Sequence, residues 1–291
     1  MKDNLAEQIR RWAVAVSQES VTPLMIERLG KFSAVALESE KETDVFTYIY
    51  ESDGAKVAGF LVAPKNRKKK LPVIIFNRGG TADYGLVPKG RLFTRFAHLA
   101  SWGYIIIGTQ YPGNALSEGS DERGGPSDVN SVLRLYDLIK LLDGADENNI
   151  GMYGESRGGM MTYLCMKQVA WIKVALTVGG LANLERSLEY RPEMVEVYEK
   201  HFGNTTEAKN ARSVVKWADE LNKTTPLCLL HGAADDKVNI RDALELAKKL
   251  DETHHPFSLH ILNDGDHGLM NVHKERDSLI QNWFEQYLKG E

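Results

Sequence analysis

The chain has 291 residues, a formal net charge of −4, and a composition that is 43% hydrophobic and 26% charged. These values are ordinary for a globular protein and give no reason to expect nucleic acid or an anionic membrane as a partner. The N-terminus is too charged for a signal peptide, and no apolar run approaches the length of a membrane span. We therefore expect a cytoplasmic protein, and the composition is compatible with a homo-oligomer.

Two cysteines, Cys165 and Cys228, both lie inside apolar segments, where a small buried thiol is the ordinary role. Neither has the neighbours that a zinc site or a CxxC redox motif requires. We expect no metal and no other cofactor.

Two patterns divide the chain before residue 65. Residues 1–43 carry apolar side chains at helical spacing and are predicted to form an N-terminal helical extension. From residue 44 the spacing changes to period two, in two runs around Asp53 and Gly54, which predicts an antiparallel hairpin with a tight Asp-Gly turn.

After the hairpin the chain alternates short apolar runs with helical patterns, which indicates a mainly parallel sheet with helices on both faces. With the hairpin, the sequence predicts about eight strands in residues 44–291. The strands after the hairpin are expected at 73–76, 104–108, 150–153, 174–178, 227–231 and 257–262, and the helices at 91–101, 126–142, 157–168, 240–251 and 272–289. Residues 180–226 break the alternation and are expected to form a partly helical cap insertion after the sixth strand.

The segment Gly154-Glu155-Ser156-Arg157-Gly158 follows an apolar strand and leads directly into a helix. This is the local layout of a nucleophile elbow, in which glycines allow a sharp strand-to-helix turn. Ser156 is therefore the candidate nucleophile, since helix N-terminal N–H groups favour developing negative charge there.

A serine nucleophile needs a histidine base that is oriented by a carboxylate. His267 lies in a turn-rich loop after the last predicted strand, where catalytic groups of α/β sheets collect. His231 closes a strand, and a structural hydrogen-bonding role is expected for it. In the loop after the penultimate strand, Asp235 is preferred to Asp236 because it comes first off the strand. The order serine, aspartate, histidine is that of α/β-hydrolases.

An oxyanion hole needs two N–H groups directed at one point. One is expected from the backbone of Arg157, which follows the nucleophile. The other is expected from Gly79 or Gly80, in the glycine pair that follows a strand.

Together these segments resemble the catalytic domain of the prolyl oligopeptidase and dipeptidyl/acylaminoacyl peptidase family. The likeness spans about residues 44–289, and it implies an α/β-hydrolase fold with Ser156, Asp235 and His267 as the triad. The segments that carry it are Arg78-Gly79-Gly80, Gly154-Glu155-Ser156-Arg157-Gly158-Gly159, His231-Gly232-Ala233-Ala234-Asp235-Asp236-Lys237-Val238 and Asp266-His267-Gly268.

The chain departs from the family pattern in two respects. Larger members carry an N-terminal β-propeller, for which the residues before the hairpin leave no room, so an open esterase-like site is expected. Many members have Tyr or His at the position of Arg78. Arg78 is a candidate for placing a fixed positive charge near the oxyanion or for binding a substrate carboxylate, and Glu155 for attracting a substrate amine. The alternative is that Arg78 forms an ion pair with a neighbour such as Glu155.

The sequence thus predicts a serine hydrolase that cleaves ester or peptide bonds in a small ester or a short peptide. A carboxylesterase without peptidase activity is the alternative. A binding protein on a hydrolase fold is a remote third, because such proteins usually lose a member of the triad.

Overall fold

The computed structural model describes residues 41–65, 67–82 and 84–290. The predicted N-terminal helical extension, residues 1–43, lies outside the described residues apart from its last three positions.

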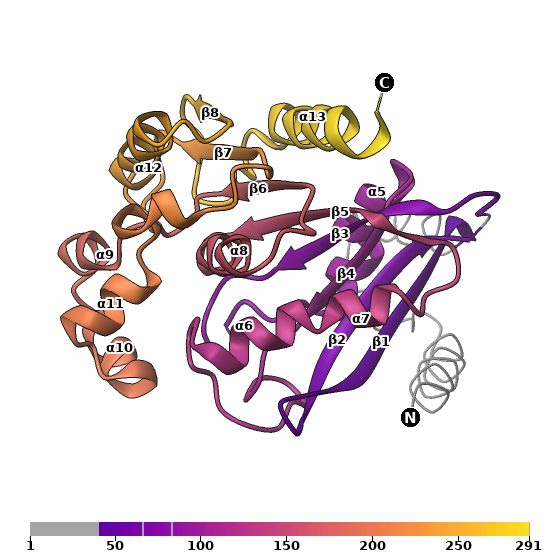
Figure 1. Cartoon of the computed structure of the whole chain (residues 1–291), viewed down its shortest axis with the longest axis horizontal. Helices are drawn as coiled ribbons and strands as arrows, with labels where there is room; N and C mark the ends of the chain where they lie inside the picture. Colours follow the sequence, from indigo (N-terminus) through magenta and orange to yellow (C-terminus); the bar gives the residue numbers. More distant parts are fainter. Residues whose placement is uncertain (1–40, 66, 83, 291) are drawn as a thin grey trace.

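One eight-stranded sheet, in the order β1-β2-β4-β3-β5-β6-β7-β8, organises the described residues (Figure 1). The β1–β2 and β2–β4 pairs are antiparallel, whereas every later pair is parallel. The predicted mainly parallel sheet with an antiparallel hairpin is therefore confirmed. The strands are β1 (Thr43–Ser52), β2 (Ala55–Pro64), β3 (Leu71–Asn77), β4 (Ile105–Thr109), β5 (Ala145–Glu155), β6 (Val174–Val178), β7 (Leu227–Gly232) and β8 (Phe257–Leu262).

The hairpin turn has the backbone geometry that its sequence predicts. Asp53 and Gly54 have φ angles of 51° and 77°, so both adopt the left-handed region that a tight two-residue hairpin requires. Glycine reaches this region without steric cost, and aspartate tolerates it better than most residues do.

Helices cover both faces of the sheet, and alternate strand residues supply a separate core to each face. Ile75 and Met152 point into one core, while Phe76 and Tyr153 point into the other. The first face packs against α6 (Pro126–Leu133), α7 (Leu135–Ile139), α8 (Arg157–Gln168) and α12 (Arg241–Glu252). The second packs against a π-helical turn (Leu92–Phe96), α5 (Ala97–Ser101) and α13 (His273–Phe284), which a further π-helical turn (Glu285–Lys289) extends. The short α4 (Lys89–Arg91) leads into the first of these π-helical turns.

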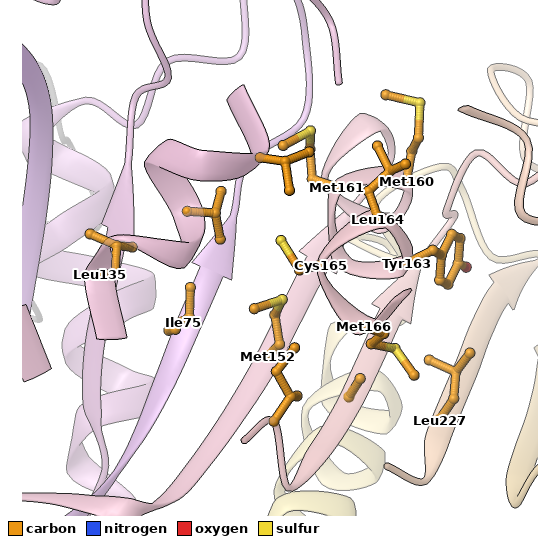
Figure 2. Close-up of a cluster of buried hydrophobic side chains, with 14 of the residues drawn as sticks. Ile75, Leu135, Met152, Met160, Met161, Tyr163, Leu164, Cys165, Met166 and Leu227 are labelled. Carbon is orange, nitrogen blue, oxygen red and sulfur yellow. The ribbon is translucent and has the colours of Figure 1, made fainter. Parts of the chain in front are cut away.

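Helix α8 lies across the centre of the sheet and is buried along most of its length (Figure 2). Its side chain Cys165 lies beside Met152 of β5, and Met161 belongs to the same buried core as Ile75 of β3. Both cysteines of the chain are buried, as predicted, and burial raises the pKa of each thiol. This packing fixes the helix that begins directly after Ser156.

The insertion between β6 and β7 is helical in part, as expected, and lies at one end of the sheet (Figure 1). It is held there by His201, whose Nδ1 lies 2.6 Å from the Asp121 carbonyl, and by Arg186, which pairs with Asp242 of α12 at 3.2 Å. Its elements are α9 (Leu184–Tyr190), α10 (Met194–Phe202), α11 (Thr206–Arg212) and 3₁₀ turns at Val214–Lys216 and Ala218–Glu220. Among the described residues, no helix is long and apolar enough to cross a membrane.

Candidate active site

Ser156 occupies the turn between β5 and α8 with φ 56° and ψ −120°. A non-glycine residue rarely adopts this strained backbone geometry, and such residues concentrate at functional sites. Ser156 also precedes the first residue of α8, whose N-terminal N–H groups have no acceptor within the helix. The serine therefore lies beside the N-terminal backbone donors of α8, of which the Gly159 N–H donates to the Ser156 carbonyl at 2.9 Å.

The glycines of the turn are required by close packing. A Cβ on Gly158 would lie 1.9 Å from the Asn77 carbonyl oxygen, and a Cβ on Gly154 would lie 2.2 Å from the Gly158 carbonyl oxygen. Both contacts are to backbone atoms, which cannot move aside easily. The absence of a side chain thus lets the start of α8 press against the end of β3.

Asp235 and His267 form a direct pair, with Oδ2 of the aspartate 2.8 Å from Nδ1 of the histidine. The Asp235 carboxylate is buried, whereas the imidazole of His267 is 26% exposed. Asp236, the less favoured candidate, is 71% exposed and pairs with Lys237 instead. The two loops therefore bring together the acid and the histidine that the sequence singles out.

Further donors surround the Asp235 carboxylate. Oδ1 accepts the backbone N–H groups of Lys237 and Val238, at 2.8 and 2.9 Å. The buried His231 places Nε2 3.3 Å from Oδ2 and 3.0 Å from the Val238 carbonyl oxygen, so its expected structural role is confirmed. Burial raises the pKa of Asp235, but hydrogen bonds from His231 and His267 outweigh that effect and hold the pKa well below its usual range.

Gly179, which follows β6, connects the serine to this pair. The Ser156 N–H donates to the carbonyl of Val178 at 2.9 Å, so Ser156 lies beside the end of β6. A Cβ on Gly179 would lie 3.1 Å from both Asp235 Oδ2 and His267 Nδ1. Gly179 thus lies between Val178, which binds the Ser156 N–H, and the Asp235–His267 pair.

The glycine pair after β3 borders the serine from the other side. A Cβ on Gly79 would lie 3.1 Å from Cβ of Ser156, so the backbone of Gly79 contacts the candidate nucleophile. Gly80 has a φ of 75°, and a Cβ there would lie 2.0 Å from the Tyr84 carbonyl oxygen. Only glycine fits at Gly80 without moving the loop.

The side chain of Arg157 forms a buried ion cluster that the sequence did not reveal. Its guanidinium donates to Asp121 at 2.8 and 2.5 Å and to Asp128 at 2.7 Å. Burial raises the pKa of Asp128; in Asp121 the same effect is outweighed by Arg157, which holds the pKa well below its usual range. These acids lie 36 and 29 positions before Arg157, so no local motif identifies them.

Glu155 pairs with residues that the sequence did not suggest. Its carboxylate contacts Arg91 at 2.6 Å, forms a second ion pair with Arg95, and accepts the Tyr153 hydroxyl at 2.6 Å. Burial opposes its ionisation, but Arg95 and then Arg91 outweigh burial and lower its pKa to about 2. The alternative that the sequence left open, an ion pair between Arg78 and Glu155, is not formed, because Arg91 and Arg95 on the helical segment after β3 neutralise Glu155.

Arg78 is fully buried and donates to main-chain carbonyls. It contacts the carbonyl oxygen of Gln110 at 3.1 and 2.7 Å and that of Gly79 at 3.0 Å. Burial lowers its pKa to about 10. The structure gives no support to the expectation that Arg78 or Glu155 binds substrate, since internal partners hold both side chains.

A strained serine at a strand-to-helix turn, an aspartate–histidine pair on later loops and this sheet order define an α/β-hydrolase. Residues 91–291 match the prolyl oligopeptidase family. The chain belongs to that family and is a hydrolytic enzyme of the serine peptidase type.

Individual relatives agree with this assignment. The chain is 26% identical over 217 residues to the uncharacterized peptidase YtmA of Bacillus subtilis, covering 73% of this chain and 81% of that protein. It is 23% identical over 278 residues to a probable dipeptidyl-aminopeptidase B of Paracoccidioides lutzii, covering 91% of this chain but only 30% of the relative.

Solved structures share the fold. The acylaminoacyl peptidase of Pyrococcus horikoshii superposes with a TM-score of 0.77 at 23% identity, covering 89% of this chain and 44% of that one. A puromycin-hydrolyzing peptidase of Mycobacterium tuberculosis gives a TM-score of 0.71 at 19% identity, covering 85% and 40%. The chain thus corresponds to less than half the length of these structures.

Proposed function

We propose that Ser156, His267 and Asp235 form a catalytic triad that cleaves ester or peptide bonds through an acyl-enzyme. The observation that carries this proposal is the 2.8 Å contact between Asp235 and His267. This pair lies beside Gly179, and the residue before Gly179, Val178, accepts the Ser156 N–H. The strained φ of Ser156 supports the same assignment.

Each member of the triad has a separate chemical task. His267 accepts the proton of the Ser156 hydroxyl as the serine oxygen attacks the substrate carbonyl, and then returns it to the leaving group. Asp235 stays ionised because its pKa is held low, so it fixes the imidazole tautomer and stabilises the imidazolium that forms. Water then attacks the acyl-enzyme by the same route and releases the acid.

The negative charge that develops on the substrate oxygen needs N–H donors. The N–H of Arg157 is the first of α8, and the Gly79-Gly80 loop contacts Ser156 from the opposite side. We assign the oxyanion hole to Arg157 together with Gly79 or Gly80, each donor contributing on the order of 10²–10³ in rate.

The family and the names of the relatives favour short peptides as substrates. Esters are intrinsically easier to cleave, so the same site is expected to hydrolyse small esters as well. An enzyme that cleaves esters and no amides would be a carboxylesterase on a peptidase-like domain.

The test compares the wild type with Ser156→Ala on short-chain p-nitrophenyl esters and on free and blocked aminoacyl p-nitroanilides. The triad predicts that the wild type turns over at least one class and that Ser156→Ala is inactive while keeping its circular dichroism spectrum. Undiminished turnover by folded Ser156→Ala would refute the assignment. A wild type that cleaves only the esters would restrict the function to a carboxylesterase.

A further inference from the structure

Three consecutive main-chain carbonyls beside Ser156 are each bound by a buried side chain. The Arg78 carbonyl accepts the hydroxyl of Tyr111 at 3.0 Å, and the Gly79 carbonyl accepts Nη1 of Arg78 at 3.0 Å. The Gly80 carbonyl accepts Nη1 of Arg157 at 3.1 Å. The loop that contacts the candidate nucleophile is therefore held by its carbonyl groups.

The three donors form one packed stack. Both guanidinium groups lie over the ring of Tyr111, at 5.0 Å from its centroid for Arg78 and 4.8 Å for Arg157. At most 1% of any of the three residues is exposed. Two carboxylates fix Arg157, and the Gln110 carbonyl fixes Arg78. Such a stack has little freedom to turn, so the carbonyls that it binds have little freedom as well.

Peptide planarity carries this constraint to the N–H groups. In a trans peptide the carbonyl of one residue and the N–H of the next point in opposite directions, and no described peptide bond of this chain is cis. Binding the carbonyls of residues 78, 79 and 80 thus turns the N–H groups of Gly79, Gly80 and Thr81 away from the stack. Among the described residues, none accepts a hydrogen bond from these three N–H groups.

We propose that Arg78, Arg157 and Tyr111 are positioning residues that orient the N–H donors of the oxyanion hole. This inference rests on the proposed function, because it takes Ser156 as the nucleophile that Gly79 contacts. It gives Arg78 a role without substrate contact. It also gives Arg157 two roles, since its own N–H points to the oxyanion while its side chain orders the opposite loop.

The planar guanidinium is essential to this arrangement. Arg78 donates to Gly79 and Gln110 at the same time from separate nitrogens, which the single ammonium of lysine cannot reproduce. Arg78→Lys therefore keeps the positive charge but cannot donate to the Gly79 and Gln110 carbonyls in the same arrangement.

The experiment measures kcat and KM of full-length Arg78→Lys on a p-nitrophenyl ester, and the inhibition constant of phenylboronic acid. The boronate forms a tetrahedral adduct on the serine, so it reports on the oxyanion hole, whereas KM reports mainly on ground-state contacts. We expect kcat to fall about 10²-fold, as for a misplaced oxyanion donor, with KM unchanged within about threefold. The boronate inhibition constant should rise by a factor similar to the loss in kcat.

Arg67 supplies the matched control. Its guanidinium also donates to a main-chain carbonyl, that of Pro64 at 2.5 Å, and to Asp44 at 3.4 Å. It lies before the start of β3, however, whereas the candidate site lies beyond the end of that strand. Arg67→Lys should keep both kcat and boronate affinity. A fall in both variants would indicate a general effect of arginine loss and overturn the proposal.

Tyr111→Phe provides a second route if Arg78→Lys does not fold. It keeps the aromatic ring and removes only the hydroxyl that binds the Arg78 carbonyl. We expect a fall in kcat of about tenfold with the same unchanged KM.

Two outcomes overturn the proposal. One is a folded Arg78→Lys or Tyr111→Phe variant whose kcat and boronate affinity are both unchanged. The other is a rise in KM alone, which would mean that Arg78 contacts substrate. If Ser156→Ala remains active, the proposed function fails first; if Ser156→Ala is inactive and these variants are normal, only the positioning role fails.

Discussion

His231 shares the triad carboxylate with His267. Its Nε2 faces two oxygen acceptors, the Val238 carbonyl at 3.0 Å and Asp235 Oδ2 at 3.3 Å, so this nitrogen carries the proton. The side chain is 1% exposed and cannot exchange these contacts for water. His231 therefore holds Asp235 in place at Oδ2, the same carboxylate oxygen that His267 contacts.

Loss of that donor should weaken catalysis and raise the pKa of Asp235. Removing one partner of a buried carboxylate costs on the order of 1–3 kcal/mol, so His231→Leu is expected to lower kcat/KM by about tenfold or more. A hydrogen-bond donor favours the ionised acid, so without it Asp235 takes up a proton at a higher pH than in the wild type. The fall of kcat/KM on the acid side of its pH profile should therefore be steeper. His231→Gln, which keeps a side-chain N–H, should recover much of the activity.

His255 is the control for this prediction. It is also buried, and its Nε2 also lies 3.0 Å from a carbonyl oxygen, that of Thr225, just before the start of β7. His255→Leu should leave the pH profile of kcat/KM unchanged. A profile that is the same in His231→Leu and wild type would show that His231 does not act on the triad.

At the scale of elements, the contact between α8 and β3 places the nucleophile. A Cβ on Gly158 would lie 1.9 Å from the carbonyl oxygen of Asn77 and 2.6 Å from its carbonyl carbon. Gly158→Ala must therefore move a helix away from a central strand. Because overpacking alone costs about 1–3 kcal/mol and here the obstacle is backbone, we expect a loss of at least about 3 kcal/mol in the free energy of unfolding, measured by urea denaturation.

Gly203, the C-cap of α10, separates this effect from the ordinary cost of replacing glycine. Its φ is 81°, and a Cβ there would meet nothing within 4 Å. Gly203→Ala should lose only about 1 kcal/mol, from backbone conformation alone. Equal losses in the two variants would contradict the close approach of α8 to β3.

The helices and strands were largely predictable, because strands that are buried on both faces of the sheet appear in the sequence as apolar runs. Strands β6 and β8 and helix α8 have the bounds that the sequence predicts. Strand β5 begins five residues earlier than expected, at Ala145 rather than at residue 150, through a polar segment that pairs with β3 across a bulge at Pro72 and Val73. The helix expected over residues 126–142 is divided at Arg134, where the sequence has no proline or glycine to mark the break.

Side-chain partners were less predictable than elements. The positions of Ser156, Asp235 and His267 follow from turn motifs at strand ends, which are local in sequence. The role of Arg78 depends on carbonyl groups, which every residue possesses, so no residue type marks it. Arg157 depends on Asp121 in a distant loop and on Asp128 in the first turn of α6, and only the folded chain brings them together.

At the scale of the whole molecule, charges on the two faces of the sheet are neutralised separately. Arg157 and its acids lie toward the α6–α8 face, while Glu155 joins β5 to the helical segment that carries Arg91 and Arg95 on the other face. Glu155 is 14% exposed, so its charge is poorly solvated and depends on these arginines. The packing of that helical segment on the sheet should therefore depend on pH.

The sign of this dependence follows from the pKa of Glu155, which is about 2 in the folded state against an ordinary value of 4.5. The ionised carboxylate therefore stabilises the fold above about pH 4.5, and this stabilisation is lost as the pH falls toward 2. Glu155→Gln should lower the free energy of unfolding at pH 7 by up to about 3 kcal/mol, and its difference from wild type should shrink between about pH 5 and pH 2. Glu193→Gln removes an exposed glutamate paired with Arg191 at 2.8 Å, and its urea denaturation curves should match the wild type throughout. A Glu155→Gln difference that stays constant with pH would mean that the Glu155 charge does not stabilise the fold.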